Sequence, residues 1–285
     1  MIYRPVLFVA STAFALSGRV VTSFNKSNPY KRKYTTTISK MNKMILESPS
    51  AERNKAPIYD QVLATNIFPQ LIKDTKSDKI KVLELAAGCG VHTIHFVQSF
   101  LSSNKELGIE WHPSDPDVEA RQSIDARIIQ AKLEDSIMNA NGWILGKSGG
   151  TACGDGDRGN VDAGASSSGQ DGNAADYEQY HNYFDLVLCI NMIHISPWEA
   201  TLGLMACAGK SLRKGGTLMC YGPYKVDGTA VESNLRFDES LKSRNSDWGV
   251  RNIEDVIDAA NKEGLSYVER IEMPANNMSV LFRKD

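Results

Sequence analysis

A short apolar run that leads directly into a glycine-rich turn is the feature that most constrains how this chain can fold. The run KIKVLEL at residues 79–85 ends at Ala86, and Gly88 and Gly90 follow before a helical pattern begins at Val91. Glycine lets the backbone turn sharply and approach a ligand closely. The start of the following helix offers free amide groups to that ligand. The pattern therefore predicts the first strand, turn and helix of a Rossmann-like domain.

Two kinds of nucleotide-containing cofactor compete for this turn. Dinucleotide-binding domains have three glycines and an acidic residue about 20 residues further on, but Thr93 stands where the third glycine would be. Here the acidic residue, Glu84, lies inside the strand and is followed by small residues, which is the pattern of S-adenosylmethionine-binding turns. Glu84 would balance the positive charge of that cofactor, directly or through water. We expect the turn residues Ala86, Gly88, Cys89 and Gly90 to contact it. Ala86 replaces the usual first glycine, and a turn without a ligand is the alternative.

A second anchor follows the next predicted strand. Asp115 comes just after the residues Trp111 to Ser114, and an acidic residue there can accept hydrogen bonds from both hydroxyls of a ribose. Asp117 and Glu110 are rivals for this role. A solvated loop carboxylate is the alternative without function.

A third element follows the buried strand at residues 184–190. Ligands of open α/β sheets bind beyond the carboxyl ends of the strands, so Asn191 and Met192 are expected at the junction of cofactor and substrate. His194 is a candidate general base because an ordinary histidine titrates near neutral pH. A structural, hydrogen-bonded histidine is the alternative.

Strands and helices alternate along the chain and two adjacent strands close it. We expect strands at residues 79–85, 107–111, 184–190, 217–221, 267–273 and 279–283, and helices at 55–73, 91–101, 117–138, 197–212 and 253–263. This order predicts an α/β Rossmann-like class I methyltransferase fold, with a mostly parallel seven-stranded sheet and a C-terminal antiparallel hairpin.

Two segments are expected to lie outside the folded domain at residues 47–285. Residues 1–40 combine a short apolar run with a Ser/Thr-rich stretch, and together they contain seven Lys/Arg and no Asp or Glu, which is typical of a targeting presequence or transit peptide. We expect an organelle, a plastid before a mitochondrion, with an unprocessed tail on a cytoplasmic protein as the alternative. Residues 146–178 are rich in Gly, Ser and Asp and predict a disordered insertion.

Charge and cysteine content exclude several classes of partner. Outside residues 1–40 the chain carries 25 basic and 34 acidic residues, so no nucleic-acid partner is expected. No apolar run is long enough to span a membrane in the mature protein. The five cysteines are widely spaced without a CxxC pair, so neither a metal site nor a disulfide framework is predicted. The oligomeric state is left open.

Several motifs together resemble the methyltransferase-like protein 26 family, which was long catalogued as a domain of unknown function. The motifs are SPSAERNK at 48–55, ELAAGCG at 84–90, WHPSD at 111–115, NMIHISPW at 191–198, YGPY at 221–224, ESN at 232–234, FD at 237–238, WG at 248–249 and MPANN at 273–277. The resemblance covers residues 47–284 outside the insertion. The family is similar to class I S-adenosylmethionine-dependent methyltransferases.

The resemblance implies S-adenosyl-L-methionine as the cofactor, bound by Glu84, Gly88, Gly90, Asp115 and Asn191. Arg53 and Asn54 would join them, with Arg53 reaching the cofactor carboxylate as a bidentate donor; surface capping is the alternative for this pair. A substrate rim is expected in the loop between the strand at Tyr221 and the helix at 253–263, and on the last hairpin. Its members are Tyr221, Tyr224, Glu232, Asn234, Trp248, Arg251, Asn276 and Asn277. The residue that contacts the adenine is not assigned.

Methyl transfer to an unidentified acceptor, a small molecule before a protein, is the function that these residues favour. It requires mainly that the acceptor be held in line with the methyl group. A non-catalytic cofactor-binding or scaffold protein on the same fold is the alternative, and an NAD-dependent oxidoreductase is a weaker third possibility.

Overall fold

The computed structural model describes residues 20–21, 36–143, 145 and 179–285. The predicted insertion at 146–178 therefore lies outside the described residues, and so does most of the predicted leader at 1–40.

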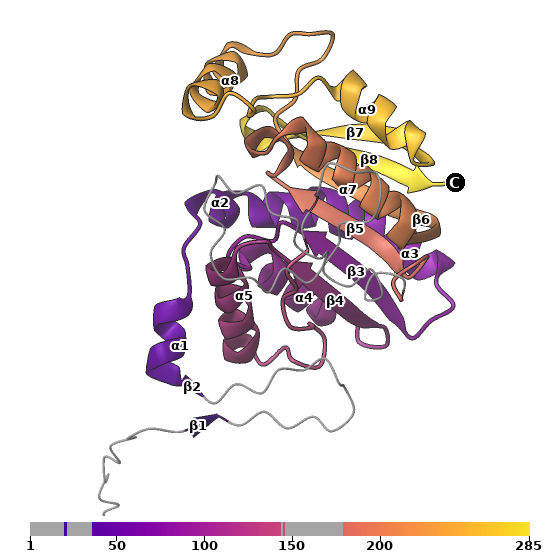
Figure 1. Ribbon diagram of the computed structural model, residues 1–285. Helices are drawn as coiled ribbons and strands as arrows, with labels where there is room; N and C mark the ends of the chain where they lie inside the picture. Colours follow the sequence, from indigo (N-terminus) through magenta and orange to yellow (C-terminus); the bar gives the residue numbers. More distant parts are fainter. Residues whose placement is uncertain (1–19, 22–35, 144, 146–178) are drawn as a thin grey trace, which may run out of the picture.

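A six-stranded sheet forms the centre of the described part of the chain (Figure 1), in the order β4-β3-β5-β6-β8-β7. Its strands are β3 (Lys79–Leu85), β4 (Gly108–Ser114), β5 (Phe184–Ile190), β6 (Leu212–Gly222), β7 (Leu265–Met273) and β8 (Asn277–Lys284). The first four strands in the sheet order are parallel, and β8 is antiparallel to both of its neighbours. The α/β fold with its C-terminal antiparallel hairpin is confirmed.

The predicted seventh strand is replaced by an irregular segment. Residues 136–141 run beside β4, where Ile137 bridges Trp111 and Asn141 bridges Ser114 in parallel. The two bridges are four positions apart on this segment but three apart on β4, so the ladder is interrupted and no continuous strand forms.

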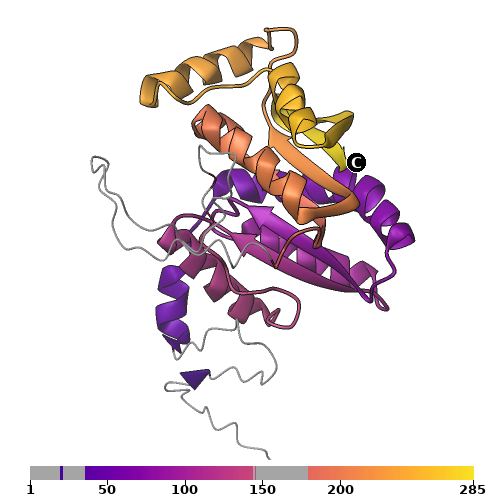
Figure 2. The ribbon, with the colours of Figure 1, turned by 45° about the vertical axis from the view of Figure 1, so that its right-hand side comes forward.

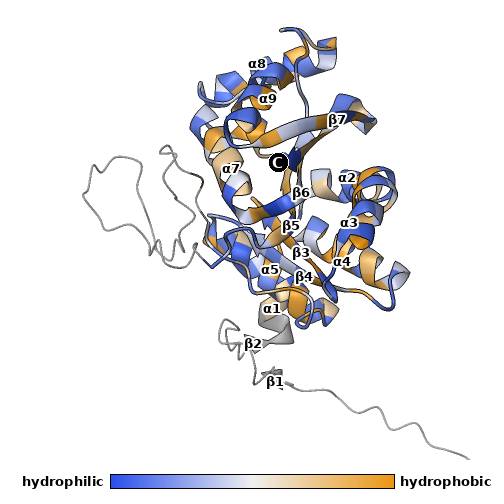
Figure 3. Ribbon diagram, turned by 90° about the vertical axis from the view of Figure 1, so that its right-hand side faces the viewer, coloured by the Kyte–Doolittle hydropathy of each residue, from blue (hydrophilic) through white to orange (hydrophobic). Residues whose placement is uncertain are grey.

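The helices cover both faces of the sheet (Figure 3). They are α1 (Ile38–Met44), α2 (Pro49–Ile58), the π-helical η1 (Tyr59–Ile67), α3 (Phe68–Asp74), α4 (Val91–Ser103), α5 (Val118–Ala131), the single turns η2 (Ile193–Ile195) and η3 (Pro274–Asn276), α7 (Trp198–Ser211), α8 (Glu232–Arg244) and α9 (Ile253–Lys262). Two-residue strands β1 (Val20–Val21) and β2 (Thr36–Thr37) pair near the N-terminus.

Alternate residues of each central strand contribute to two separate cores, because successive side chains point to opposite faces. Ile80 and Val82 of β3 pack with α2, η1, α3 and α4, whereas Leu83 and Leu85 pack with α7 and α9. Glu84 is two residues after Val82, so its side chain lies on the same face of the sheet, which α4 covers.

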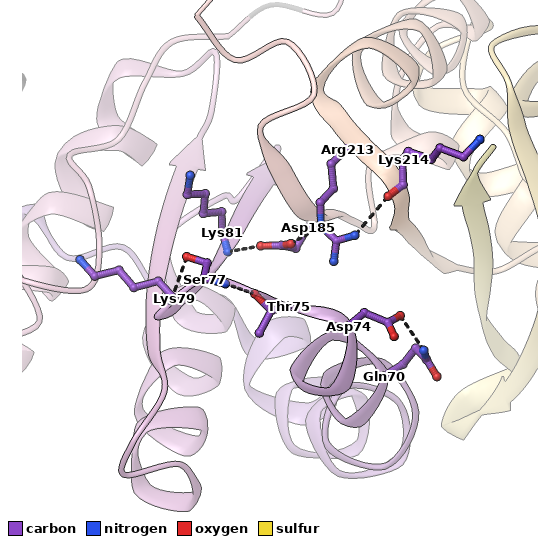
Figure 4. A network of polar contacts seen from close by, with 9 residues as sticks. All are labelled: Gln70, Asp74, Thr75, Ser77, Lys79, Lys81, Asp185, Arg213 and Lys214. Atoms are coloured by element: carbon purple, nitrogen blue, oxygen red, sulfur yellow. Dashed lines mark hydrogen bonds and ion pairs between the residues drawn. The ribbon is translucent and has the colours of Figure 1, made fainter.

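The two ends of the parallel strands differ. At the amino end, Asp185 of β5 accepts a hydrogen bond from Lys81 N at 2.7 Å and pairs with Arg213 (Figure 4). At the carboxyl end the sheet is flanked by α2 and α8 (Figures 1 and 2). At the amino end an ion pair thus joins β5 to β6, whereas the carboxyl end carries the candidate cofactor-binding residues.

Several predicted boundaries were wrong, including the start of β6, which begins at Leu212. β4 continues through His112 and Pro113 to Ser114, because proline is tolerated in an edge strand. α5 ends at Ala131, since Lys132 adopts a left-handed conformation. The predicted loop between β6 and α9 contains the helix α8.

In the described part of the chain, no helix has both the length and the apolar character required to span a bilayer.

Candidate cofactor-binding site

The turn between β3 and α4 has the left-handed backbone that its sequence predicts. Ala86, Gly88 and Gly90 have φ angles of 53°, 58° and 85°, and Gly90 caps the start of α4. A Cβ atom built on Gly88 would meet no protein atom within 4 Å. The backbone at Gly88 therefore borders open space into which a ligand can approach.

Glu84 lies directly beneath this turn and is 1% exposed. Its Oε2 accepts hydrogen bonds from Thr93 Oγ1 at 2.6 Å and from Trp111 Nε1 at 2.8 Å. Burial raises the pKa of Glu84 to about 7, while the Thr93 and Trp111 hydrogen bonds act in the opposite direction and Asp115 adds to the rise. The sequence identified Glu84, but it gave no sign of these two donors.

Asp115 is attached directly to the glycine-rich turn. Its Oδ2 accepts from Gly88 N at 2.8 Å and its Oδ1 from Asp117 N at 2.9 Å. Arg121 of α5, which the sequence analysis missed, donates to Asp115 O at 2.9 Å and is itself buried. Burial raises the pKa of the Asp115 carboxyl. One of these contacts joins Asp115 to the glycine-rich turn, and the other two hold it at the end of β4.

The two rivals of Asp115 have other partners. Asp117 caps α5 by accepting from Ala120 N at 2.8 Å. Glu110 accepts from Tyr183 Oη at 2.6 Å and lies 2.9 Å from His112 Nε2. Neither contacts the turn, so the geometry favours Asp115 for the ribose.

Asn191 and Met192 follow β5 as expected, and Asn191 has a left-handed φ of 60°. Asn191 N donates to Tyr221 O at 2.8 Å, which joins the ends of β5 and β6. His194 lies further out in η2, 5.6 Å from the Phe237 ring of α8. Burial lowers the pKa of His194 to about 4, and Arg244 and Arg251 add to the effect. The ring is therefore neutral but a weak base, unlike the near-neutral titration that its sequence context predicts.

The motif around Arg53 and Asn54 lies in α2, across the carboxyl end of the sheet. Asn54 Oδ1 is 2.7 Å from Nε2 of the buried His92, in the first turn of α4. Burial raises the pKa of Tyr221, and the nearby amide side chains of Asn54 and Asn277 act in the opposite direction. Arg53 is exposed. Asn54 is thus tied to the site through His92, a residue that the sequence analysis did not single out.

Part of the predicted substrate rim comes together and part does not. Asn234 of α8 donates to Asn276 O at 2.8 Å, and Tyr221 and Asn277 lie at the same end of the sheet. The other four members have different surroundings. Tyr224 is buried in the core, Glu232 is exposed and pairs with Arg236, Trp248 lies under Arg244, and Arg251 donates to the carbonyls of Ser196 and Asp247.

Within the described ranges, no group of three or more His, Cys, Asp or Glu side chains is arranged to hold a metal ion. A shallow groove of about 500 Å³ lies between α7 and α9, and Trp198 and Arg251 are among its lining residues.

The fold resembles that of solved methyltransferases at low sequence identity. The methyltransferase SibL, described as S-adenosylmethionine-dependent, aligns with a TM-score of 0.54 and 13% identity, over 82% of this chain and 55% of that one. An O-methyltransferase family protein from Burkholderia thailandensis aligns at 0.52 and 11%, over 86% and 63%. A candidate sarcosine dimethylglycine methyltransferase from Galdieria sulphuraria aligns at 0.53 and 13%, over 85% and 92%. This chain thus spans little more than half the length of the first two. At these identities the likeness establishes the class I methyltransferase fold.

The family comparison gives the closer relationship. A family model described as "Protein of unknown function (DUF938)" matches residues 46–139 and 161–284, which is well over half of the chain. The chain is a member of the DUF938 family.

Proposed function

We propose that this protein is an S-adenosylmethionine-dependent methyltransferase that acts on a small molecule. The observation that carries the proposal is the hydrogen bond from Gly88 N to Asp115 Oδ2, which holds this carboxylate against the turn that follows the strand of Glu84. The relationship to methyltransferase-like protein 26 that the motifs imply is part of the same proposal.

The residues present fit this cofactor. The buried Glu84 Oε1 has no hydrogen-bond partner among the described residues, and a cationic group would supply one. Gly88 leaves open space where a Cβ would stand. Asp115 uses one lone pair of each oxygen for backbone amides, so each oxygen can accept a second hydrogen bond, as two ribose hydroxyls require.

When bound, S-adenosylmethionine supplies a methyl group activated by its sulfonium charge. Asp115 and Glu84 would hold the methyl donor, and Arg53 in the middle of α2 would offer a cation for its carboxylate. Asn191 and Met192 border the place where the acceptor enters. The contribution of these residues would be to hold the acceptor and the methyl donor in a reactive orientation, which supplies much of the rate enhancement in a transfer of this kind.

A test combines the protein with S-adenosylmethionine and fractions of a small-molecule extract, and measures S-adenosylhomocysteine. Formation by the wild type but not by Asp115→Ala supports the proposal. Binding of S-adenosylhomocysteine without turnover in any fraction favours the non-catalytic alternative. Binding of NADH in its place favours an oxidoreductase.

The leader is a separate proposal. We infer that residues 1–40 direct the protein to an organelle, a plastid before a mitochondrion, because this stretch is basic and free of acidic residues. A fluorescent protein fused behind residues 1–40 is expected in that organelle, and a diffuse cytosolic signal contradicts the inference.

A further inference from the structure

One oxygen of the Glu84 carboxylate accepts two hydrogen bonds, whereas the other accepts none from the described residues. Both donors, Thr93 Oγ1 and Trp111 Nε1, bind Oε2. Oε1 is buried and makes no hydrogen bond among the described residues. Native proteins seldom leave a buried polar atom unpaired, and a water or ligand is a common explanation.

The two donors reach Glu84 from different elements. Trp111 pairs with Val82 across β3 and β4, so its ring lies on the same sheet face as Glu84. Thr93 belongs to the first turn of α4, directly after the glycine-rich turn. Because the indole N–H can only donate a hydrogen bond, Oε2 acts as an acceptor toward Trp111. Oε1 is then the oxygen whose lone pairs have no hydrogen bond.

While Thr93 and Trp111 both donate to Oε2, a proton on this carboxyl group sits on Oε1. A cationic ligand would bind the same atom. The proton and the ligand cation thus compete for Oε1.

This inference rests on the proposed function. We propose that Thr93 and Trp111 are positioning residues that keep Glu84 Oε1 free for the ammonium group of the cofactor, which binds it directly or through one water. Cofactor binding then displaces a proton from Glu84. The proton leaves Oε1 for the solvent as the ammonium pairs with the carboxylate. No bond within the cofactor forms or breaks in this step.

The charges around Glu84 place this competition near neutral pH. Burial raises the pKa of Glu84 to about 7 and the Asp115 carboxylate contributes to the rise, against the two hydrogen bonds. Cys189 of β5 is a neutral thiol, because burial raises its pKa to about 12. His92 of α4 is uncharged, because burial lowers its pKa to about 4. Neither of these two groups changes charge near pH 7, whereas Glu84 does.

Calorimetric titration with S-adenosylhomocysteine in two buffers of different ionisation enthalpy tests the proposal. At pH 7 the wild type is expected to release about half a proton per ligand bound, and Glu84→Gln none. Methylthioadenosine, which lacks the ammonium group, is expected to release none from the wild type. Thr93→Val is expected to move the midpoint of proton release upward by about one pH unit, and the matched control Thr93→Ser to keep the wild-type midpoint.

The failures are distinguishable. S-adenosylhomocysteine that binds with no proton release between pH 6 and 8 overturns this inference and leaves the proposed function standing. No change of midpoint in a folded Thr93→Val overturns the role of Thr93. No binding by the wild type overturns both proposals. Thermal melting of each variant shows whether it is folded, and the wild-type measurement does not depend on any variant.

Discussion

The backbone amide of Gly88 donates a hydrogen bond to Asp115 Oδ2 at 2.8 Å. The two residues are 27 positions apart and belong to the ends of adjacent parallel strands. This bond holds the carboxylate against the turn, so the side chain proposed for the ribose and the backbone proposed for the rest of the cofactor move as one unit.

The open space at Gly88 predicts that Gly88→Ala impairs ligand binding more than folding. A left-handed alanine costs about 1 kcal/mol of unfolding free energy, but its Cβ meets no protein atom and enters the ligand's space. We expect the affinity for S-adenosylhomocysteine to fall at least tenfold, as measured by calorimetry. Gly228→Ala is the matched control, since Gly228 also has a positive φ and open space, in a distant turn. Equal affinity loss in both variants, or none in Gly88→Ala, contradicts the assignment.

The buried Glu84 predicts an unusual pH dependence of stability. Its folded pKa of about 7 lies above its ordinary value of 4.5. Between these values the folded state holds a proton that the unfolded state has lost, so the contribution of Glu84 to stability falls as pH rises and levels off above 7. Relative to the wild type, Glu84→Gln should therefore gain up to about 3 kcal/mol of unfolding free energy between pH 5 and pH 8. Urea unfolding at the two pH values measures this, and a constant difference would show that Glu84 is ionised throughout.

The buried imidazole of His194 is expected to stay neutral across the physiological range. Burial, with Arg244 and Arg251 nearby, lowers its pKa to about 4, so its ring resonances should not titrate between pH 6 and 8. An NMR pH titration, with the signals assigned by loss in His194→Asn, checks this. A midpoint above pH 6 would restore the general-base role for which the sequence makes His194 a candidate.

The two flanks of residues 146–178 meet in an aromatic cluster, which predicts that this stretch is dispensable for folding. The Trp143 and Tyr180 rings are 5.6 Å apart, and Tyr180 stacks on Phe184 at 5.4 Å. Replacing residues 147–176 by about eight Gly and Ser residues should leave the melting temperature within a few degrees, because closure entropy changes slowly with loop length. Trp143→Ala removes a ring of the cluster and should cost about 3 kcal/mol or more. A collapse of stability in the shortened chain would assign the stretch a structural role.

The strands and the glycine-rich turn could be predicted because their signals are local. The run at Lys79–Leu85 is apolar and bounded by small residues, and β3 and β5 form as expected. Asp115 could be singled out from its position after a strand, because the carboxyl ends of parallel strands share one edge of the sheet.

The remaining features depend on contacts that no local pattern contains. α8 was missed because its surface is largely polar and only Asn234, Asp238 and Leu241 are buried. Thr93 and Trp111 meet Glu84 only after α4 folds over the face shared by β3 and β4. The low pKa of His194 arises from burial by elements that lie after it in the chain, including α8.

Titration of the wild type and of Asp115→Ala with S-adenosylhomocysteine tests the central claim most directly. We predict that one molecule binds per wild-type chain and that Asp115→Ala weakens binding at least tenfold, because one carboxylate accepts hydrogen bonds from both ribose hydroxyls. Equal affinity in the two proteins would contradict the assignment of the site. No binding by either, at ligand concentrations up to the millimolar range, would contradict the proposal that this domain holds S-adenosylmethionine.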